Sequence, residues 1–309
     1  MTLAVEAREL GRWYGDVVGV SDVSLRIEGG IVGLLGANGA GKSTFLKLLV
    51  GELRPSRGSI RVLGEEPFAN AKLYRRIGFA PQQDALWSDL TARGTLEFLL
   101  RVSGFSRGDS EARALRALER VKLVDAADRR VGGFSKGMRQ RVRIAQAIAH
   151  DPEFVVLDEP LNGLDPLARR DTLDLFRDLA EGGTHVLVSS HVLHEVEELT
   201  RTIVLLHRGR VLALGSSPEI RALLDRRPRR VAIRARDPRR LARALLDVDG
   251  VTAVRLGDDG LLDVETSRLD ELQTRFPAIA AAERAGVSSL SVSDASLDAL
   301  FDDLVGGLR

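Results

Sequence analysis

The chain has 309 residues, of which 44% are hydrophobic and 29% are charged, with 45 basic side chains against 44 acidic ones. This length favours two domains or one large one, and the formal net charge of +1 argues against nucleic-acid binding through bulk charge. Because the chain contains no cysteine, disulfide scaffolds, thiolate nucleophiles, cysteine-ligated zinc and iron–sulfur clusters are excluded. No segment approaches the roughly 18 consecutive apolar residues of a membrane-spanning helix, and residues 1–12 lack a signal-peptide pattern, so we expect a soluble chain that is not exported.

The N-terminal segment, residues 2–35, has the pattern of β-strands. It ends in the nearly unbroken apolar run Ile31–Leu35, which predicts a strand that is buried on both faces. The glycine-rich segment 36–41 interrupts this run, and Lys42–Val50 resumes with helical spacing. The order is therefore strand, glycine-rich loop and helix.

The middle of the chain alternates between helical and strand patterns. Residues 84–149 predict a helical insertion, and the elements after it are expected as strands at 154–157, 186–188 and 203–206 with helices at 169–180 and 192–199. Strands that alternate with helices indicate an α/β fold, in which a largely parallel sheet is covered on both faces.

A change of composition after residue 224 divides the chain. Residues 225–230 have the composition of a linker, and the rest predicts strands at 231–235, 251–256, 261–265 and 287–292 with helices at 238–246, 269–276 and 296–305. This order fits a small α+β, ferredoxin-like sandwich plus one helix. We therefore expect one domain over 1–224, with a helical subdomain at about 84–149, and an accessory domain over 225–309.

The glycine-rich loop fits the phosphate-binding pattern G-x-x-x-x-G-K-[S/T], known as the P-loop or Walker A motif. Its residues are Gly36, Ala37, Asn38, Gly39, Ala40, Gly41, Lys42, Ser43 and Thr44. The glycines let successive N–H groups point at one anion, and the following helix adds its positive N-terminal end. Lys42 would reach the β and γ phosphates, and the Ser43 hydroxyl would complete the coordination of Mg²⁺. A glycine-rich turn with a surface lysine is the alternative.

An acidic pair follows the apolar strand at 154–157. Asp158 falls at the carboxyl end of that strand, where ligands bind in open α/β sheets, and a carboxylate there suits Mg²⁺. Glu159 is then placed to orient or deprotonate an attacking water. The alternative is that the pair caps a helix.

These motifs and others in the same order resemble the nucleotide-binding subunits of ATP-binding cassette (ABC) transporters, over about residues 2–224. Besides the P-loop and the acidic pair, the matching positions are Tyr14, Gln82, Phe134–Met138, Asp165 and His191. The resemblance implies a P-loop, ABC-type ATPase domain in which Tyr14 stacks on adenine, adding about 1–3 kcal/mol. It also implies that Gln82 senses Mg²⁺ and the γ phosphate, and that His191 holds the γ phosphate. Taken singly, Tyr14 is equally an edge aromatic, Gln82 a surface amide and His191 a helix cap.

The segment at 134–138 occupies the position of the ABC signature and departs from its common form, Leu-Ser-Gly-Gly-Gln. Phe134, Lys136 and Met138 differ, whereas Ser135 and Gly137 are retained. The sequence Ser-Lys-Gly-Met-Arg-Gln is similar to that of exporter ATPases that work with a separate permease. The departure therefore favours an exporter within the family.

The resemblance also implies an assembly and a mechanism. Two subunits would dimerise head to tail around two ATP molecules, each signature completing the partner's site, with Asp165 in the loop that crosses between them. Lys42, Glu159 and His191 would act in hydrolysis, and Ser43, Gln82 and Asp158 would hold Mg²⁺. The partner would be an integral-membrane permease, at the cytoplasmic face of the cell membrane, and no nucleic-acid partner is expected.

Two other functions stay open at this point: a soluble ABC ATPase that acts on nucleic acid or ribosomes, and an ABC importer ATPase. Arg139, Arg141 and Arg143 are expected to form a solvated helix face rather than a nucleic-acid patch. Trp87 lies in the segment that would contact a permease helix, and it is either an exposed anchor or packed between subdomains.

Overall fold

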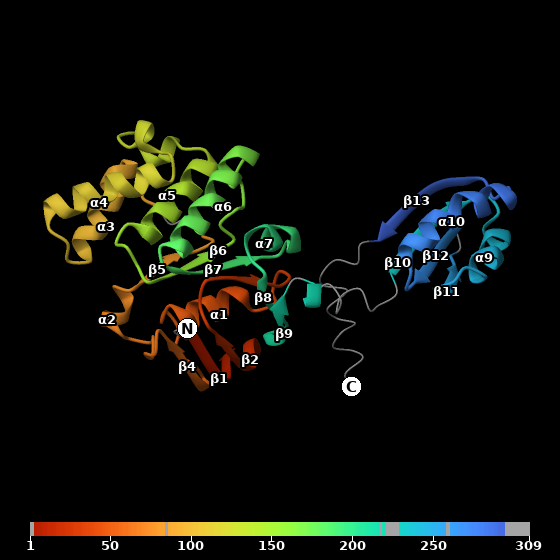
Figure 1. Ribbon diagram of the computed structural model, residues 1–309, viewed down its shortest axis with the longest axis horizontal. Coiled ribbons are helices and arrows are strands. Elements are labelled where there is room, and N and C mark those ends of the chain that lie inside the picture. The colour runs from red at the N-terminus through yellow and green to blue at the C-terminus, as the bar shows by residue number, and fades with distance from the viewer. Residues whose placement is uncertain (1–2, 84–85, 217, 221–228, 258–259, 294–309) are drawn as a thin grey trace. The chain divides into compact units, whose positions relative to one another are not determined.

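The computed structural model describes residues 3–83, 86–216, 218–220, 229–257 and 260–293 (Figure 1). The chain forms two compact units, Met1–Ser217 and Pro218–Arg309. The boundary between them falls before the position, residue 224, at which the composition changes. Within the described residues, no helix combines the length and the hydrophobicity that crossing a membrane requires.

A six-stranded sheet forms the centre of the first unit, in the order β5-β6-β7-β3-β8-β9. Its strands are β3 (Ile31–Leu35), β5 (Ile77–Ala80), β6 (Phe154–Asp158), β7 (His185–Ser190), β8 (Thr202–His207) and β9 (Arg210–Ser216). All neighbouring strands are parallel except β8 and β9. The predicted α/β fold with a largely parallel sheet is confirmed.

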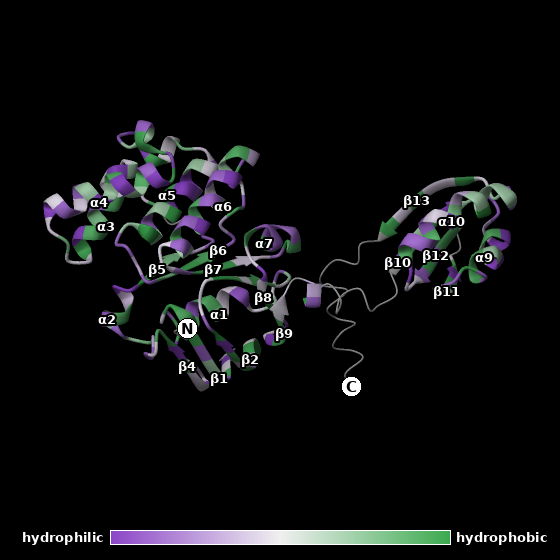
Figure 2. Ribbon diagram, in the orientation of Figure 1, coloured by the Kyte–Doolittle hydropathy of each residue, from purple (hydrophilic) through white to green (hydrophobic). Residues whose placement is uncertain are grey.

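The apolar runs of the central strands are buried on both faces of the sheet. Val155 and Leu157 of β6 belong to one hydrophobic core, whereas Phe154 and Val156 belong to another. Because successive side chains of a strand point to opposite faces, these two cores lie on opposite sides of the sheet. The hydrophobic colour of β6 and β7 in Figure 2 follows from this double burial.

A three-stranded antiparallel sheet, in the order β2-β1-β4, packs into the second of these cores. Its strands are β1 (Val5–Tyr14), β2 (Val17–Ile27) and β4 (Arg57–Val62). Neither β4 nor β5 is predicted from the sequence. β5 has only four residues, and its Gly78 allows a close approach, since a Cβ there would lie 1.9 Å from the Ala147 carbonyl oxygen.

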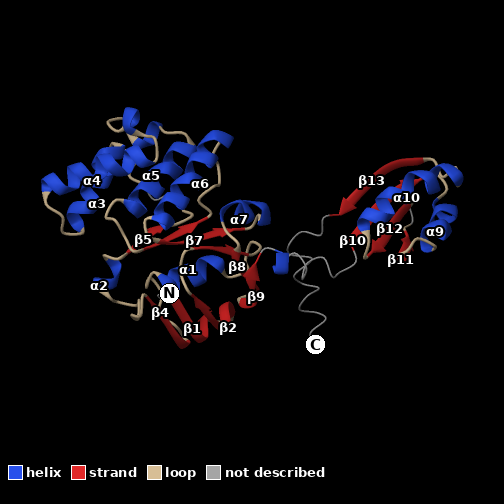
Figure 3. Cartoon of the chain, viewed as in Figure 1, coloured by secondary structure: helices blue, strands red, loops and turns tan. Residues whose placement is uncertain are grey.

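The helices of the first unit cover both faces of the large sheet (Figure 3). They are α1 (Lys42–Leu49), α2 (Ala71–Tyr74), α3 (Ala92–Val102), α4 (Arg107–Arg120), α5 (Lys136–Ile148), α6 (Pro166–Glu181) and α7 (Leu193–Leu199), with short 3₁₀ turns at Val124–Ala126 and Val131–Gly133. α6 begins before the predicted Arg169, because the Asp165 side chain caps it and Pro166 takes its first position.

The second unit has the predicted order of strands and helices. Its elements are β10 (Arg229–Ala235), α9 (Pro238–Leu246), β11 (Val251–Leu256), β12 (Leu261–Thr266), α10 (Leu269–Ala282) and β13 (Val287–Ser293). The sheet order β11-β12-β10-β13, antiparallel throughout, is that of a ferredoxin-like sandwich. α9 and α10 cover one face of this sheet, and α10 runs past its predicted end at Phe276. The predicted helix at 296–305 lies outside the described residues.

Candidate functional site

The phosphate-binding loop joins β3 to α1, as the sequence predicts. Gly41 caps α1 with φ of 100°, and Gly39 has φ of 80°, both in the left-handed region that favours glycine. At Gly41 a Cβ would also lie 2.3 Å from the Gly19 carbonyl oxygen. The conformation of the loop therefore requires glycine at positions 39 and 41. A loop of this kind, followed directly by the free N-terminal amides of a helix, is the arrangement that binds phosphate.

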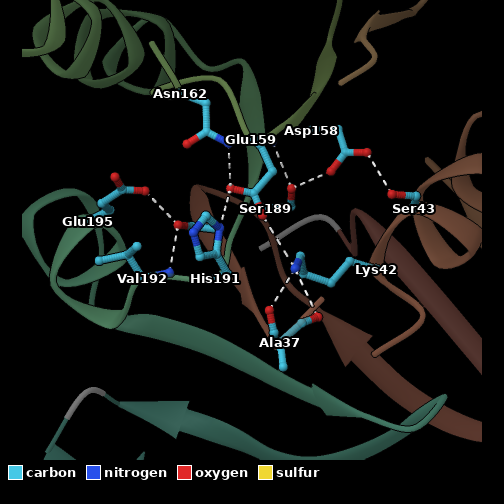
Figure 4. A network of polar contacts seen from close by, with 12 residues as sticks. Ala37, Lys42, Ser43, Asp158, Glu159, Asn162, Ser189, His191, Val192 and Glu195 are labelled. Carbon is cyan, nitrogen blue, oxygen red and sulfur yellow. Dashed lines mark hydrogen bonds and ion pairs between the residues drawn. The ribbon is translucent and has the colours of Figure 1, made fainter. Parts of the chain in front are cut away.

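Lys42 is buried at the start of α1, with 6% of its surface exposed. Its Nζ donates to the carbonyl oxygens of Gly36 at 2.6 Å and Ala37 at 3.2 Å, and it lies 3.3 Å from Glu159 Oε1. That carboxylate oxygen makes no hydrogen bond within the described residues. A buried ammonium group is thus held inside the loop with a carboxylate as its counter-ion (Figure 4).

Asp158, at the carboxyl end of β6, is joined to the loop through Ser43. The Ser43 Oγ donates to Asp158 Oδ2 at 2.9 Å, and the Ser189 Oγ donates to Asp158 Oδ1 at 2.6 Å. Ser189 stands opposite Asp158 in the parallel register of β6 and β7, and its hydroxyl also accepts from the Glu159 N–H at 2.9 Å. One serine therefore fixes the backbone and side chain of the acidic pair.

Glu159 follows directly and has an unusual backbone conformation, with φ of 51°. Its side chain is 3% exposed, and its Oε2 contacts the His191 Nδ1 at 2.9 Å and accepts from the Asn162 Nδ2 at 3.3 Å. Non-glycine residues in this region are uncommon, and they concentrate at functional sites. Glu159 is thus held between the P-loop lysine and the predicted switch histidine, as Figure 4 shows.

A cleft of about 300 Å³ opens over these groups. Its lining residues are Tyr14, Val17, Val18, Gly19, Ala37, Asn38, Gly39, Gly41, Lys42, Ser43, Thr44, Gln82, Asp158 and Glu159. Tyr14, at the end of β1, is 43% exposed, and the guanidinium of Arg12 lies 5.1 Å from the centre of its ring. The structure therefore brings Tyr14 and Gln82 to the same cleft as the P-loop and the acidic pair.

The signature residues do not line this cleft. Ser135 caps α5, with its Oγ accepting from the Met138 N–H at 3.2 Å, and Phe134 is buried in the core around α5. Gly137 lies close to the loop before α6, where a Cβ would be 3.0 Å from the Gly163 carbonyl oxygen. Asp165 caps α6 by accepting from the Ala168 N–H at 2.9 Å. Within the described residues, the signature and Asp165 therefore make contacts with other parts of their own chain, outside the cleft.

Two residues of the site's surroundings are not predicted from the sequence. Ser189 bridges the acidic pair, and Glu195, 8% exposed, accepts from the Ser190 Oγ at 2.6 Å while pairing with Arg169 at 3.0 Å. The available signal for Ser189 is its place as the first polar residue after the apolar run 186–188. Glu195 gives no such signal, since its helix reads as an ordinary charged surface helix.

The expectation of a solvated arginine face on α5 is wrong for Arg143. This side chain is 7% exposed and donates from Nη1 to the carbonyl oxygens of Pro81 at 3.0 Å and Gln82 at 2.5 Å. Arg143 lies on α5, which packs on β5, and the segment that follows β5 supplies the acceptors.

The chain is similar to known proteins. Residues 20–162 match the family model described as "ABC transporter". Over its whole length the chain resembles the daunorubicin/doxorubicin resistance ATP-binding protein DrrA of Streptomyces peucetius, at 34% identity with 99% of this chain and 93% of that protein covered. The linearmycin resistance ATP-binding protein LnrL of Bacillus subtilis is 32% identical, with 98% of each chain covered.

A solved structure gives the same result for the fold. The dimeric, post-hydrolysis structure of the ATP-binding cassette MJ0796 with ADP and Pi is 27% identical and superposes with a TM-score of 0.64, covering 69% of this chain and 98% of that one. Residues 20–162, which the family model matches, contain the phosphate loop and the acidic pair. The chain therefore belongs to the ATP-binding proteins of ABC transporters, which bind and hydrolyse ATP.

Proposed function

We propose that this chain is the ATPase subunit of an exporter, and that two copies bind head to tail around two ATP molecules to drive a separate permease. The observation that carries the proposal is the buried group of Lys42, Asp158 and Glu159 beside the phosphate loop, with the half-exposed His191 in contact with Glu159. The export direction is supported by relatives named for drug resistance and by the Nod factor export ATP-binding protein I of Burkholderia orbicola, 38% identical over 69% of this chain.

In the proposed site, the loop amides and Lys42 bind the β and γ phosphates. Lys42 has three N–H donors, two of which are directed at the carbonyl oxygens of Gly36 and Ala37. Its contact with Glu159 is an ion pair that an incoming γ phosphate would replace, because phosphate oxygens compete for the same ammonium. ATP binding would then leave the Glu159 carboxylate available to accept a proton from the attacking water.

The oxygen atoms around Ser43 fit a magnesium ion. The hydroxyl of Ser43 and the carboxylate of Asp158 lie 2.9 Å apart in the cleft, and both are the hard oxygen ligands that Mg²⁺ prefers. When bound with ATP, the ion would neutralise charge that develops on the phosphates. Gln82, which lines the same cleft, would complete this group.

In the proposed dimer, the signature segment of each copy completes the nucleotide cleft of the other. Ser135, Lys136 and Gly137, at the N-terminus of α5, do not line the chain's own cleft, and a helix N-terminus attracts anions. In a head-to-tail pair, each α5 would point at the nucleotide of the other copy. Asp165, at the start of α6 beside this segment, would then lie at the interface.

A second groove, of about 540 Å³, is the proposed seat of the permease. It is lined by Leu96, Leu99 and Leu100 of α3 and by His150. It adjoins the nucleotide cleft, with which it shares Ser43, Gln82 and Asp158. Phe98, on the same helix α3, is 49% exposed and packs edge-on against Trp87, which is 47% exposed. Exposed aromatic pairs of this kind are frequent anchors of protein interfaces. The permease would hold the chain at the cytoplasmic face of the membrane.

Glu159→Gln tests the proposed reaction. Removing a general base should lower the hydrolysis rate by about 100- to 10,000-fold, whereas ATP binding should be retained and a dimer should accumulate with ATP. Phosphate release, equilibrium nucleotide binding and molar mass by light scattering measure these three quantities. Glu153→Gln is the matched control, because Glu153 precedes the same strand and pairs at the surface with Arg76. Normal turnover of Glu159→Gln would refute the role of Glu159.

The partner is tested separately. Affinity purification of the tagged chain from detergent-solubilised membranes should recover an integral-membrane protein, and Trp87→Ala should reduce the recovered amount. Recovery of no membrane protein would refute the permease assignment while leaving the ATPase reaction intact.

A further inference from the structure

Arg143 joins two segments that the proposed function treats separately. It lies on α5, the helix that begins with the signature, and its guanidinium reaches the backbone after β5, where Gln82 leads towards the nucleotide cleft. α5 and β5 are already in close contact at Gly78. Arg143 extends that contact from the strand to the segment that follows it.

The geometry of this contact is that of a clamp. One nitrogen, Nη1, donates to both the Pro81 and the Gln82 carbonyl oxygens, at 3.0 and 2.5 Å, and the other, Nη2, donates to the buried Gln140 Oε1. The guanidinium is planar and rigid, so fixing Nη2 on α5 also fixes the direction in which Nη1 points. The position of the Gln82 backbone is therefore set by a side chain of α5.

The two side chains that form this clamp are buried. Arg143 is 7% exposed and Gln140 is 1% exposed, whereas the Gln82 side chain is exposed and lines the cleft. A hydrogen bond from a charged donor to a carbonyl in such a buried place contributes more than one at the surface. The buried clamp thus ends at Gln82, whose exposed side chain lines the proposed nucleotide cleft.

We infer that Arg143 is a positioning residue for ATP hydrolysis, which holds the Gln82 backbone against α5 so that the Gln82 amide reaches the magnesium and γ-phosphate region of the cleft. This role rests on the proposed action of Gln82 in hydrolysis. Because α5 starts at the signature, the same clamp connects the segment proposed to face the partner's ATP with the residue that faces the chain's own ATP.

Arg143→Met tests the inference, since methionine keeps much of the apolar stem and removes every donor. Small displacements of catalytic groups lower rates strongly, so we expect kcat of the purified full chain to fall by about 10- to 100-fold with KM for ATP changed by less than about threefold. Arg141→Met is the matched control. Arg141 lies on the same helix and also donates to two carbonyl oxygens, but those belong to Val121 and Lys122. It should leave kcat within about twofold of the original chain.

A double-mutant cycle with Gln82→Ala separates positioning from a general loss of stability. If Arg143 acts through Gln82, Arg143→Met should cause little further loss of kcat once Gln82 is already alanine. If the two losses multiply, or if Arg141→Met lowers kcat as much as Arg143→Met, the inference is overturned. If Gln82→Ala alone leaves kcat unchanged, the proposed role of Gln82 fails first, and the inference fails with it.

Thermal unfolding of each variant establishes that the rates compare folded proteins. Should Arg143→Met not fold, Arg143→Lys replaces it in the same cycle, because lysine keeps the charge but not the planar fork that contacts both Gln140 and the carbonyl oxygens. The same two outcomes, a vanishing or a multiplying second loss, then decide the inference.

Discussion

The two units of the chain bury different kinds of side chain. In the first, Lys42, Arg143, Asp158, Glu159 and Glu195 are each at most 8% exposed, whereas in the described part of the second unit the one buried polar side chain is Thr266. Burying a charge costs several kcal/mol unless it is paired and hydrogen-bonded. The first unit buries one such pair, Lys42 and Glu159, beside the phosphate loop, whereas the described part of the second unit is held together by apolar packing.

Among the substitutions that test this comparison, Lys42→Ala should have the largest effect, and the effect should be on ATP binding and hydrolysis. It removes the cation of the phosphate loop, so ATP affinity should fall about 10- to 100-fold and hydrolysis should cease, because charge-assisted hydrogen bonds contribute about 1.5–3 kcal/mol. Isothermal titration with ATP and phosphate release measure both. Lys47→Ala is the control, since Lys47 lies on the same helix but pairs at the surface with Glu52. Unchanged affinity in Lys42→Ala would show that the loop does not hold the phosphates.

Ile233→Ala is the corresponding change in the second unit. Ile233 is fully buried on β10, and its truncation should lower the unfolding free energy of that unit by about 2–5 kcal/mol. Both tryptophans, Trp13 and Trp87, lie in the first unit, so their fluorescence reports that unit alone, whereas far-ultraviolet circular dichroism reports both. The urea transition should move in the dichroism signal only.

The exposed Ser291 of β13 provides the control for this experiment, as Ser291→Ala should leave both transitions in place. A shift of the fluorescence transition in Ile233→Ala, together with a loss of ATP affinity, would contradict the separation of the two units. In that case the apolar core of the second unit would also stabilise the ATP site.

Ser189→Ala changes the first unit without removing a charge. Its hydroxyl bonds both Asp158 and the Glu159 N–H, so its loss leaves two buried groups with one partner fewer and should cost about 1–3 kcal/mol of unfolding free energy. Tryptophan fluorescence during urea unfolding measures the cost. Ser103→Ala is the control, because that hydroxyl bonds the Leu99 carbonyl oxygen at an exposed helix end. Equal stability of the two variants would show that water replaces the Ser189 hydroxyl.

Ser189 also shows which parts of the site can be predicted from the sequence and which cannot. The P-loop and the Asp158-Glu159 pair are visible in the sequence because their chemistry depends on neighbouring residues in a fixed order. That Ser189 stands opposite Asp158 depends on the register of β6 and β7, which no local pattern specifies. The sequence predicts a solvated position for Arg143 for the same reason, since its acceptors, Pro81 and Gln82, lie in a distant segment.

The second unit shows the opposite balance. Its strands and helices follow one another in the order that a ferredoxin-like sandwich requires, so the order of the elements predicts the fold. No motif in it indicates chemistry, because apolar packing specifies a fold and not a reaction. The sequence therefore predicts the fold of the second unit but not its role, whereas in the first unit it indicates the P-loop and the acidic pair but not β4 and β5.

The pH dependence of stability gives the smallest effect and separates the units once more, since all five histidines lie at or before residue 207. Burial lowers the pKa of His150 below its ordinary value of 6.5, although the ring contacts the Ile77 carbonyl oxygen. In the unfolded chain the pKa returns to that value, so the unfolded state binds more protons and the first unit loses stability as pH falls through about 6.5. His150→Gln should reduce this loss of unfolding free energy, measured by tryptophan fluorescence. The change should be smaller than that caused by Ser189→Ala. His194→Gln is the control, because its side chain is exposed and the substitution should leave the loss unchanged. An unaltered pH profile in His150→Gln would assign the loss to other groups of the first unit.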